Sequence, residues 1–225
     1  MIKHLTAAIA ATTLMAGAAH ATPISFADEA DTNGERGVPD GTVLNIGGLN
    51  ISFLAGTLAG DGRIELNSFS AYLDSSSNGL PGGLGVCRVL DSDNQCDPSG
   101  DDSTDGDNGI NEAVSLFFED GPINIFGLSF RDGNHNQIND SSGLIDYAIF
   151  FDDGTNTGLV TSTFADLVAL ASAGLRDVLA INLGFNNTEF YLESLSDVPI
   201  PGALPLLISG LAGLGFASRK KKKAA

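Results

Sequence analysis

Short runs of alternating apolar and polar residues, bounded by Gly, Asn or Asp, constrain the fold of this chain more than any other feature. Side chains of a strand point to opposite faces in turn, so the alternation predicts half-buried β-strands separated by turns. The runs cover residues 42–46, 50–55, 63–74, 112–120, 123–132, 144–153, 178–184 and 189–198. Eight such brief runs predict an all-β fold, an antiparallel β-sandwich of jelly-roll-like proportions.

Residues 162–176 depart from this alternation and predict one short helix between two late strands. Apolar side chains recur there at helical spacing and share one face, namely Phe164, Leu167, Val168 and Ala171. Thr163, three residues before Asp166, is typical of a helix N-cap, and Gly174 is typical of a helix end. The last two strands are expected to form a closing hairpin through residues 185–188.

Charge is distributed unevenly along the 225 residues. Residues 22–197 contain all 28 acidic residues, five arginines and no lysine, so 5 − 28 gives this segment a net charge of −23. A surface this acidic repels phosphate backbones and anionic lipid, which argues against nucleic-acid binding, and it attracts divalent cations. We expect residues 22–197 to form one acidic β-sandwich domain.

The N-terminal segment has the pattern of a secretory signal peptide. Lys3 precedes an apolar run that ends in a small-x-small triplet at residues 19–21. We therefore predict a signal helix within a signal peptide over residues 1–21, with cleavage after Ala21. A short helix of the domain core is the alternative.

Export would decide the state of the two cysteines, Cys87 and Cys96. In an oxidising compartment two cysteines this close in sequence form a local disulfide most simply. A two-cysteine metal site is the weaker alternative.

The C-terminal segment is apolar and then basic. Residues 198–217 carry no charge, and as a helix they would be about 30 Å long, which is enough to cross the hydrocarbon layer of a bilayer. Prolines crowd the first half, so the predicted transmembrane helix is residues 204–216. The basic run at 219–223 would keep the C-terminus in the cytoplasm and leave the acidic domain outside. A buried last helix followed by a basic tail is the alternative.

The same C-terminal residues carry a family resemblance. Val198, Pro199 and Pro201 open a proline motif that is followed by the apolar run and the basic end. This order resembles the PEP-CTERM sorting signal, and within that group its Val-Pro-Leu-Pro-Ala variant. Ile200 and Gly202 stand where the variant has Leu and Ala.

The resemblance covers residues 198–225 and implies a substrate of an exosortase-type membrane protease that acts near the proline motif. Proteins of this family are exported by Gram-negative bacteria, often ones that make exopolysaccharide, and end at the cell surface or in the extracellular biofilm matrix. It implies a chain held transiently in the inner membrane through residues 204–216 and then released or re-anchored outside. More loosely, residues 83–138 resemble the globular region of other members of the group.

Few residues of the acidic domain are suited to catalysis. Its single histidine, His135, lies in a polar turn without a serine elbow or paired cysteine nearby, and we expect it to be exposed. We therefore predict a protein that is not an enzyme, with a structural or adhesive role and exopolysaccharide as a partner. A carbohydrate-binding module would need an exposed aromatic ring, for which Tyr72, Tyr147 and Tyr191 are the candidates. A glycan hydrolase, the remaining alternative, would need two carboxylates opposed across a groove.

Calcium is the predicted cofactor, and the first candidate site lies in the acidic loop before residue 113. Asp101, Ser103, Asp105 and Glu112 reproduce the oxygen-ligand spacing of an EF-hand loop at positions 1, 3, 5 and 12, with Gly106 at the tight bend. Neither flank is predicted to be helical. In a stretch this rich in aspartate, a chance match is the alternative.

A second candidate calcium site lies in the turn that contains the histidine. Asp132, Asn134, Asn136 and Asp140 have the spacing of ligands 1, 3, 5 and 9, although Gly143 stands where a bidentate Glu belongs. An asparagine-rich hairpin turn solvated by water is the alternative.

Overall fold

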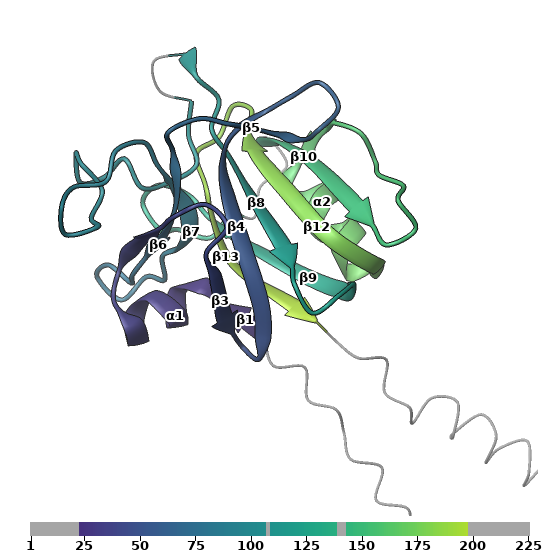
Figure 1. Cartoon of the computed structure of the whole chain (residues 1–225), viewed down its shortest axis with the longest axis horizontal. Coiled ribbons are helices and arrows are strands. Elements are labelled where there is room, and N and C mark those ends of the chain that lie inside the picture. Colours follow the sequence, from purple (N-terminus) through teal and green to yellow (C-terminus); the bar gives the residue numbers. More distant parts are fainter. Residues whose placement is uncertain (1–22, 107–108, 139–142, 198–225) are drawn as a thin grey trace, which may run out of the picture. The chain divides into compact units, whose positions relative to one another are not determined.

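The alternating segments pair into one antiparallel sheet that curls into a half-barrel (Figure 1). The computed structural model describes residues 23–106, 109–138 and 143–197. Within these ranges thirteen strands are hydrogen-bonded into the sheet. They are β1 (Pro23–Ser25), β2 (Arg36–Val38), β3 (Val43–Ile46), β4 (Leu49–Leu58), β5 (Ile64–Leu66), β6 (Ser70–Asp74), β7 (Gly83–Cys87), β8 (Ala113–Phe118), β9 (Ile123–Arg131), β10 (Leu144–Phe151), β11 (Val160–Thr163), β12 (Leu175–Phe185) and β13 (Tyr191–Asp197).

The sheet has the strand order β2-β6-β7-β13-β9-β12-β8-β4-β3, and β1, β5, β10 and β11 pair beside this path. Strand β12 changes neighbours along its length. Leu175 and Val178 pair with β9, whereas residues 180–184 pair with β8 on one side and β10 on the other. The register shifts between Leu175 and Val178, and such irregularities bend a strand and increase its twist. This switch joins the two parts of the sheet and lets it curl.

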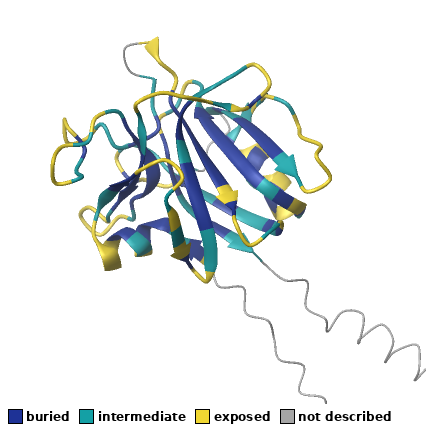
Figure 2. Cartoon of the chain, in the orientation of Figure 1, coloured by how far each residue is buried: buried dark blue, intermediate teal, exposed yellow. Residues whose placement is uncertain are grey.

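The antiparallel all-β class predicted from the alternation is therefore confirmed. The two separate stacked sheets of a sandwich are not confirmed, because β12 connects the described strands into one continuous sheet. The strands carry most of the buried positions and the connecting loops most of the exposed ones (Figure 2). Phe130, Phe164 and Phe190 pack edge to face in this core, with ring centroids 5.1–5.8 Å apart.

The predicted late helix is present as α2 (Phe164–Ser172). Its N-cap is Thr163, whose side chain accepts a hydrogen bond from the backbone N–H of Asp166 at 3.1 Å. Phe164, Leu167 and Ala171 are buried, as their spacing predicts. The apolar face therefore packs onto the sheet.

A second helix, α1 (Phe26–Asn33), makes the prediction of a single helix wrong. Ser25 caps it by accepting a hydrogen bond from the N–H of Asp28 at 3.1 Å. Only Phe26, Ala27 and Ala30 are buried, so one large apolar side chain holds the helix on the sheet. The remaining positions are polar or exposed, which leaves too little periodic signal for a sequence-based prediction.

The strand predictions need four corrections, the first of which is that the short strands β1, β2 and β11 were not predicted. Strand β7 lies in a stretch that carried no strand signal, because two of its five residues are glycines. The run at 63–74 forms two strands, β5 and β6, with different partners. The predicted hairpin between β12 and β13 is wrong, because β9 lies between these two strands in the sheet.

Several predicted features fall outside the described residues. They are the signal segment with Ala21, the sorting residues Val198, Pro199 and Pro201, the predicted membrane helix at 204–216, and Asp140. Among the residues that are described, no helix is both long enough and apolar enough to cross a membrane.

Candidate metal centre

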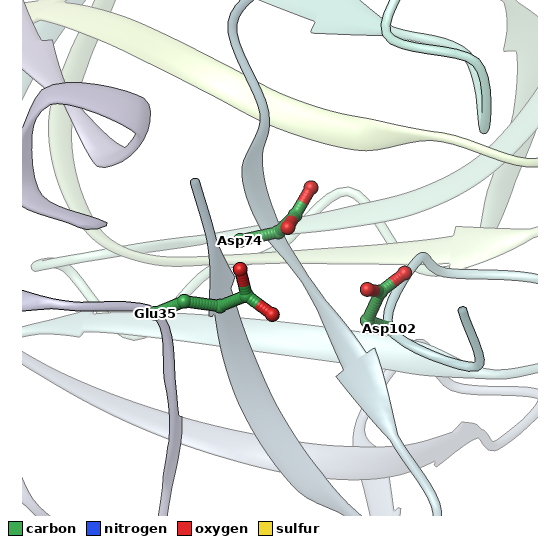
Figure 3. A group of neighbouring side chains, drawn as sticks. All are labelled: Glu35, Asp74 and Asp102. Carbon is green, nitrogen blue, oxygen red and sulfur yellow. The ribbon is translucent and has the colours of Figure 1, made fainter. Parts of the chain in front are cut away.

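Three carboxyl groups from distant parts of the sequence meet beside β6. Glu35 precedes β2, which pairs with β6 through Arg36 and Leu73, and Asp74 is the last residue of β6. Asp102 lies in the loop that follows β7. One carboxylate oxygen from each of the three lies within 4.8 Å of the others, and Figure 3 shows the side chains converging. We call this group the β6 cluster.

A glycine in β7 lets the loop bring Asp102 to this place. Gly85 pairs with Tyr72 of β6, and a Cβ atom built on Gly85 would lie 2.1 Å from the carbonyl oxygen of Asp102. No side chain could fit between the strand and the loop at that distance. The Gly-rich sequence of β7, which hid the strand, therefore places a carboxyl group next to Asp74.

Two buried tyrosines donate hydrogen bonds to the outer members of the β6 cluster. The hydroxyl of Tyr72 donates to Oε1 of Glu35 at 2.8 Å, and that of Tyr191 donates to Oδ1 of Asp102 at 2.5 Å. Burial, together with these carboxylates, raises the pKa of both tyrosines. Both phenols are therefore fixed as hydrogen-bond donors to these two carboxyl groups.

Asp74 is the most buried member of the β6 cluster, with 5% of its surface exposed, and its Oδ2 accepts no hydrogen bond. Nε2 of His135 lies 3.0 Å from that oxygen, but its geometry does not make a hydrogen bond. Nδ1 of His135 lies 3.3 Å from the carbonyl oxygen of Leu80, which can only accept, so we assign the ring proton to Nδ1. Nε2 of His135 therefore faces the carboxyl group of Asp74.

Desolvation, followed by the charges of Asp102 and Glu35, raises the pKa of Asp74 to about 8. None of the five arginines within residues 22–197 forms an ion pair with the β6 cluster. Arg36, the nearest of them in sequence to Glu35, pairs with Glu29 at 2.7 Å instead. The cluster thus concentrates negative charge without an arginine to offset it.

Two turns of the same geometry flank the β6 cluster. In each, the first Asp accepts hydrogen bonds from the backbone N–H groups two and four residues later, and the fourth residue has a positive φ. One turn spans 91–95 and the other 132–136. The first turn brings Gln95 to the backbone oxygen of Glu35 at 2.8 Å, and the second brings His135 to Asp74.

The second turn corrects one prediction and leaves another as a prediction. Asp132 accepts hydrogen bonds from the backbone N–H groups of Asn134 and Asn136, and the Nδ2 donor of Asn136 faces that carboxylate at 3.4 Å, so a second calcium site there stays a prediction. The fourth predicted ligand, Asp140, lies outside the described residues. His135 is buried, with 9% exposure, instead of exposed, because its positive φ turns the ring toward Asp74 and Tyr191.

The first predicted calcium loop is assembled in part. Asp101, Asp105 and Glu112 each place a carboxylate oxygen within 4.8 Å of the others, so three of the four predicted ligands meet. Ser103 does not join them, because its hydroxyl donates to Oε1 of Glu189 at 2.6 Å. We call the three carboxyl groups, together with the arginine described next, the Arg88 cluster.

Arg88 already supplies a cation to this cluster. Its Nε donates to Oε1 of Glu112 at 2.5 Å, and its Nη2 lies 3.2 Å from Oδ1 of Asp105. Glu112 is fully buried, and its other oxygen accepts the N–H of Asp105 at 3.1 Å. Desolvation raises the pKa of Glu112, although both of these hydrogen bonds act to lower it. Burial acts to lower the pKa of Arg88, but the hydrogen bond and the charge of Glu112 raise it overall. We take the pair as ionised, since both oxygens of Glu112 accept from N–H donors.

The predicted disulfide is confirmed and lies close to both clusters. Cys87 and Cys96 are bonded, with their Cα atoms 5.7 Å apart, and both are buried. Sγ of Cys96 lies 2.7 Å from the carbonyl oxygen of Asp101, and Tyr72 packs in the same small apolar group. The bond thus supports the segment from which Asp101 enters one cluster and Asp102 enters the other.

The chain matches no family model, and neither a curated protein nor a solved structure matches it. What the clusters can bind is therefore judged from their own residues. Acidic clusters of this kind can hold a metal ion. Sequence reasoning found Asp101, Asp105 and Glu112 from their spacing, but it missed Glu35 and Asp74, whose only signal is a charged residue at the edge of an apolar strand.

Proposed function

We propose that this chain is an exported, non-catalytic protein of the cell surface or extracellular matrix. The observation that carries the proposal is the disulfide between Cys87 and Cys96, because such bonds persist in oxidising compartments and are rare in the cytosol. The predicted signal segment at 1–21 supports the same location. The PEP-CTERM-like segment at 198–225 supports an exosortase-type membrane protease as the partner that processes the chain, after transient residence in the inner membrane.

The role proposed for the domain is structural or adhesive, within a polysaccharide-rich biofilm matrix. A curled antiparallel sheet around one core is compatible with a jelly-roll-like sandwich, the finer fold we propose for residues 22–197. The high negative charge suits a hydrated matrix in which divalent cations link acidic groups. Calcium is included in the proposal for this reason.

Carbohydrate binding through tyrosine rings has less support. Tyr72, Tyr147 and Tyr191 are all buried, with exposures of 1, 6 and 2%, so none offers an open ring face to a sugar.

A hydrolytic site has less support as well. A hollow of about 250 Å³ is lined by Glu112 and Asp146, but Glu112 is fully buried and paired with Arg88. Neither function is our first choice.

Mass spectrometry of the mature protein, recovered from the surface or matrix fraction of an exporting Gram-negative host, tests the proposal. We expect an N-terminus at Thr22 and loss of the residues after the proline motif. Recovery of intact residues 220–225 in the matrix fraction would contradict processing. A Pro199→Ala/Pro201→Ala variant is the matched control, and it should retain its tail.

The same experiment can report the compartment. Thiol alkylation before digestion should leave Cys87 and Cys96 unmodified in the exported chain. A chain that lacks residues 2–21 should stay inside the cell and be alkylated at both cysteines. Equal alkylation of the two forms would count against export as the source of the disulfide.

A further inference from the structure

The β6 cluster brings three carboxyl groups together, no arginine of the described residues pairs with them, and the nearest group able to carry a positive charge is His135. Its three carboxyl groups come within 4.8 Å of one another, and Asp74 is more than nine-tenths buried with an oxygen that accepts no hydrogen bond. A buried polar atom of this kind costs roughly as much as a lost hydrogen bond unless a ligand satisfies it. The unpartnered oxygen of Asp74 is thus a second observation, beside the acidic cluster itself, that points to a bound cation.

The donor atoms identify the class of cation. Glu35, Asp74 and Asp102 offer only carboxylate oxygens, which suit hard divalent cations rather than zinc or copper. Calcium takes oxygen ligands at roughly 2.3–2.6 Å, so two ligands on opposite sides of the ion lie about 4.6–5.2 Å apart. Magnesium at roughly 2.0–2.1 Å would need them about 4.0–4.2 Å apart. Oxygens within 4.8 Å of one another fit around either ion, and we favour calcium because it accepts an irregular arrangement of ligands from three separate elements, whereas magnesium demands a near-ideal octahedron.

The surroundings hold the ligands in place and leave a way in for the ion. Glu35 is oriented by the hydroxyls of Tyr72 and Ser75, at 2.8 and 3.0 Å. Asp102 is oriented by Tyr191. Both carboxylates remain partly exposed, so an ion from solvent can reach these two, whereas Asp74 is buried.

We propose that Glu35, Asp74 and Asp102 form a calcium site that is distinct from the acidic loop containing Asp105. The ion satisfies the buried oxygen of Asp74 and joins α1's end, β6 and the loop after β7 into one rigid unit. The Arg88 cluster does not need the ion, because a guanidinium already bridges Asp105 and Glu112. The inference deepens the calcium part of the proposed function and does not depend on export.

Isothermal titration of the purified full-length chain with calcium chloride tests the site. We expect one calcium ion per chain, and melting about 5–10 °C higher than in chelator when calcium is at about 100 times its Kd. Magnesium at the same concentration controls for screening of the net charge, and we expect a smaller shift.

Three variants locate the ion. Asp74→Asn should abolish the calcium response and raise the melting temperature in chelator, because it replaces a buried carboxyl group, whose charged form is disfavoured there, by a neutral amide. Glu35→Gln, at a partly exposed position, should weaken binding at least about tenfold and covers the case in which Asp74→Asn fails to fold. Asp105→Asn is the matched control and should keep the wild-type affinity.

Two outcomes would overturn the proposal. One is the absence of calcium binding by the wild-type chain. The other is a calcium affinity that neither Asp74→Asn nor Glu35→Gln changes. If Asp105→Asn loses calcium binding while Asp74→Asn keeps it, the ion belongs to the Arg88 cluster instead. Mass spectrometry of the chain termini tests export separately, so the calcium site can be refuted while export is confirmed, and the reverse.

Discussion

The Arg88 cluster and the β6 cluster are built from the same kind of residue, three carboxyl groups each, but they differ in their cation. In the first, Arg88 bridges Asp105 and Glu112 from a partly buried position. In the second, none of the described arginines forms an ion pair with the carboxylates, and the nearest group able to carry a positive charge is His135. The comparison teaches that local acid density does not identify a metal site, and that the location of the few arginines decides it.

Two adjacent residues make the contrast sharpest. Asp101 belongs to the Arg88 cluster and Asp102 to the β6 cluster. Successive side chains of an extended segment point in opposite directions, so one loop serves both clusters. Such a division cannot be detected from composition.

Removal of Arg88 is the change with the largest expected effect. Arg88→Met leaves Glu112 buried with no guanidinium partner, and breaking a buried pair from one side costs about 3–5 kcal/mol of unfolding free energy. Urea denaturation measures the loss. Arg63→Ala is the matched control, because the Arg63–Asp61 pair is exposed, and it should change stability by less than about 1 kcal/mol. Equal effects of the two variants would show that the Arg88 cluster is not held by its arginine.

The disulfide comes next in expected effect. Cys87 and Cys96 are nine positions apart, and closing a loop of that size stabilises a domain by about 2–3 kcal/mol in the chain-entropy model. Cys87→Ala/Cys96→Ala should lose this amount in urea denaturation and should also bind calcium more weakly, since Asp102 follows the bonded segment. Unchanged calcium affinity would mean that the bond does not help to position Asp102.

Features of the fold and of the two clusters that depend on local sequence patterns could be predicted. Alternation gave the antiparallel strands, and Thr163 with its apolar face gave α2. The spacing of Asp101, Asp105 and Glu112 brought out a real spatial cluster. It could not show that Arg88, which is far from Glu112 in sequence, occupies the centre of that cluster.

The β6 cluster was missed for a different physical reason. Its members lie on three elements, and they meet only because β2 pairs with β6 and because Gly85 admits the loop. Helix α1 and strand β7, which frame it, were also missed, one for its polar composition and the other for its glycines. Contacts made by long-range pairing leave no periodic trace in the sequence.

The pH dependence of stability, spread over several pH units, separates the two clusters. Asp74 has its pKa raised to about 8 in the folded chain, against about 3.9 when unfolded, so the folded state binds the additional proton between these values. Stability in chelator should therefore fall as pH rises from about 5 to 8, by at most about 1.4 kcal/mol per pH unit for this one proton.

Asp74→Asn should reduce this slope, and thermal unfolding across the pH range measures it. Saturating calcium should reduce the slope of the wild-type chain as well, because the bound ion favours the carboxylate. Asp105→Asn should leave the Asp74 contribution in place. A wild-type slope that Asp74→Asn does not alter would contradict the assignment of the buried proton to Asp74.

The smallest expected effect concerns the two matching turns. Asp132→Ala and Asp91→Ala each remove a carboxylate that accepts two backbone N–H groups, which should cost about 1 kcal/mol in either turn. Only Asp132→Ala loosens the turn that holds His135 against Asp74. It should therefore change calcium affinity in a titration more than Asp91→Ala does, and the reverse order would show that His135 has no influence on the β6 cluster.

Terbium luminescence tests most directly whether the β6 cluster is the place where this protein holds a cation. The chain has no tryptophan and three tyrosines, and two of these, Tyr72 and Tyr191, donate hydrogen bonds to Glu35 and Asp102. A terbium ion that replaces calcium there should emit strongly when tyrosine is excited, and added calcium should suppress the emission. We expect Asp74→Asn to abolish this signal and Asp105→Asn to preserve it. Emission that survives in Asp74→Asn and disappears in Asp105→Asn would contradict the account.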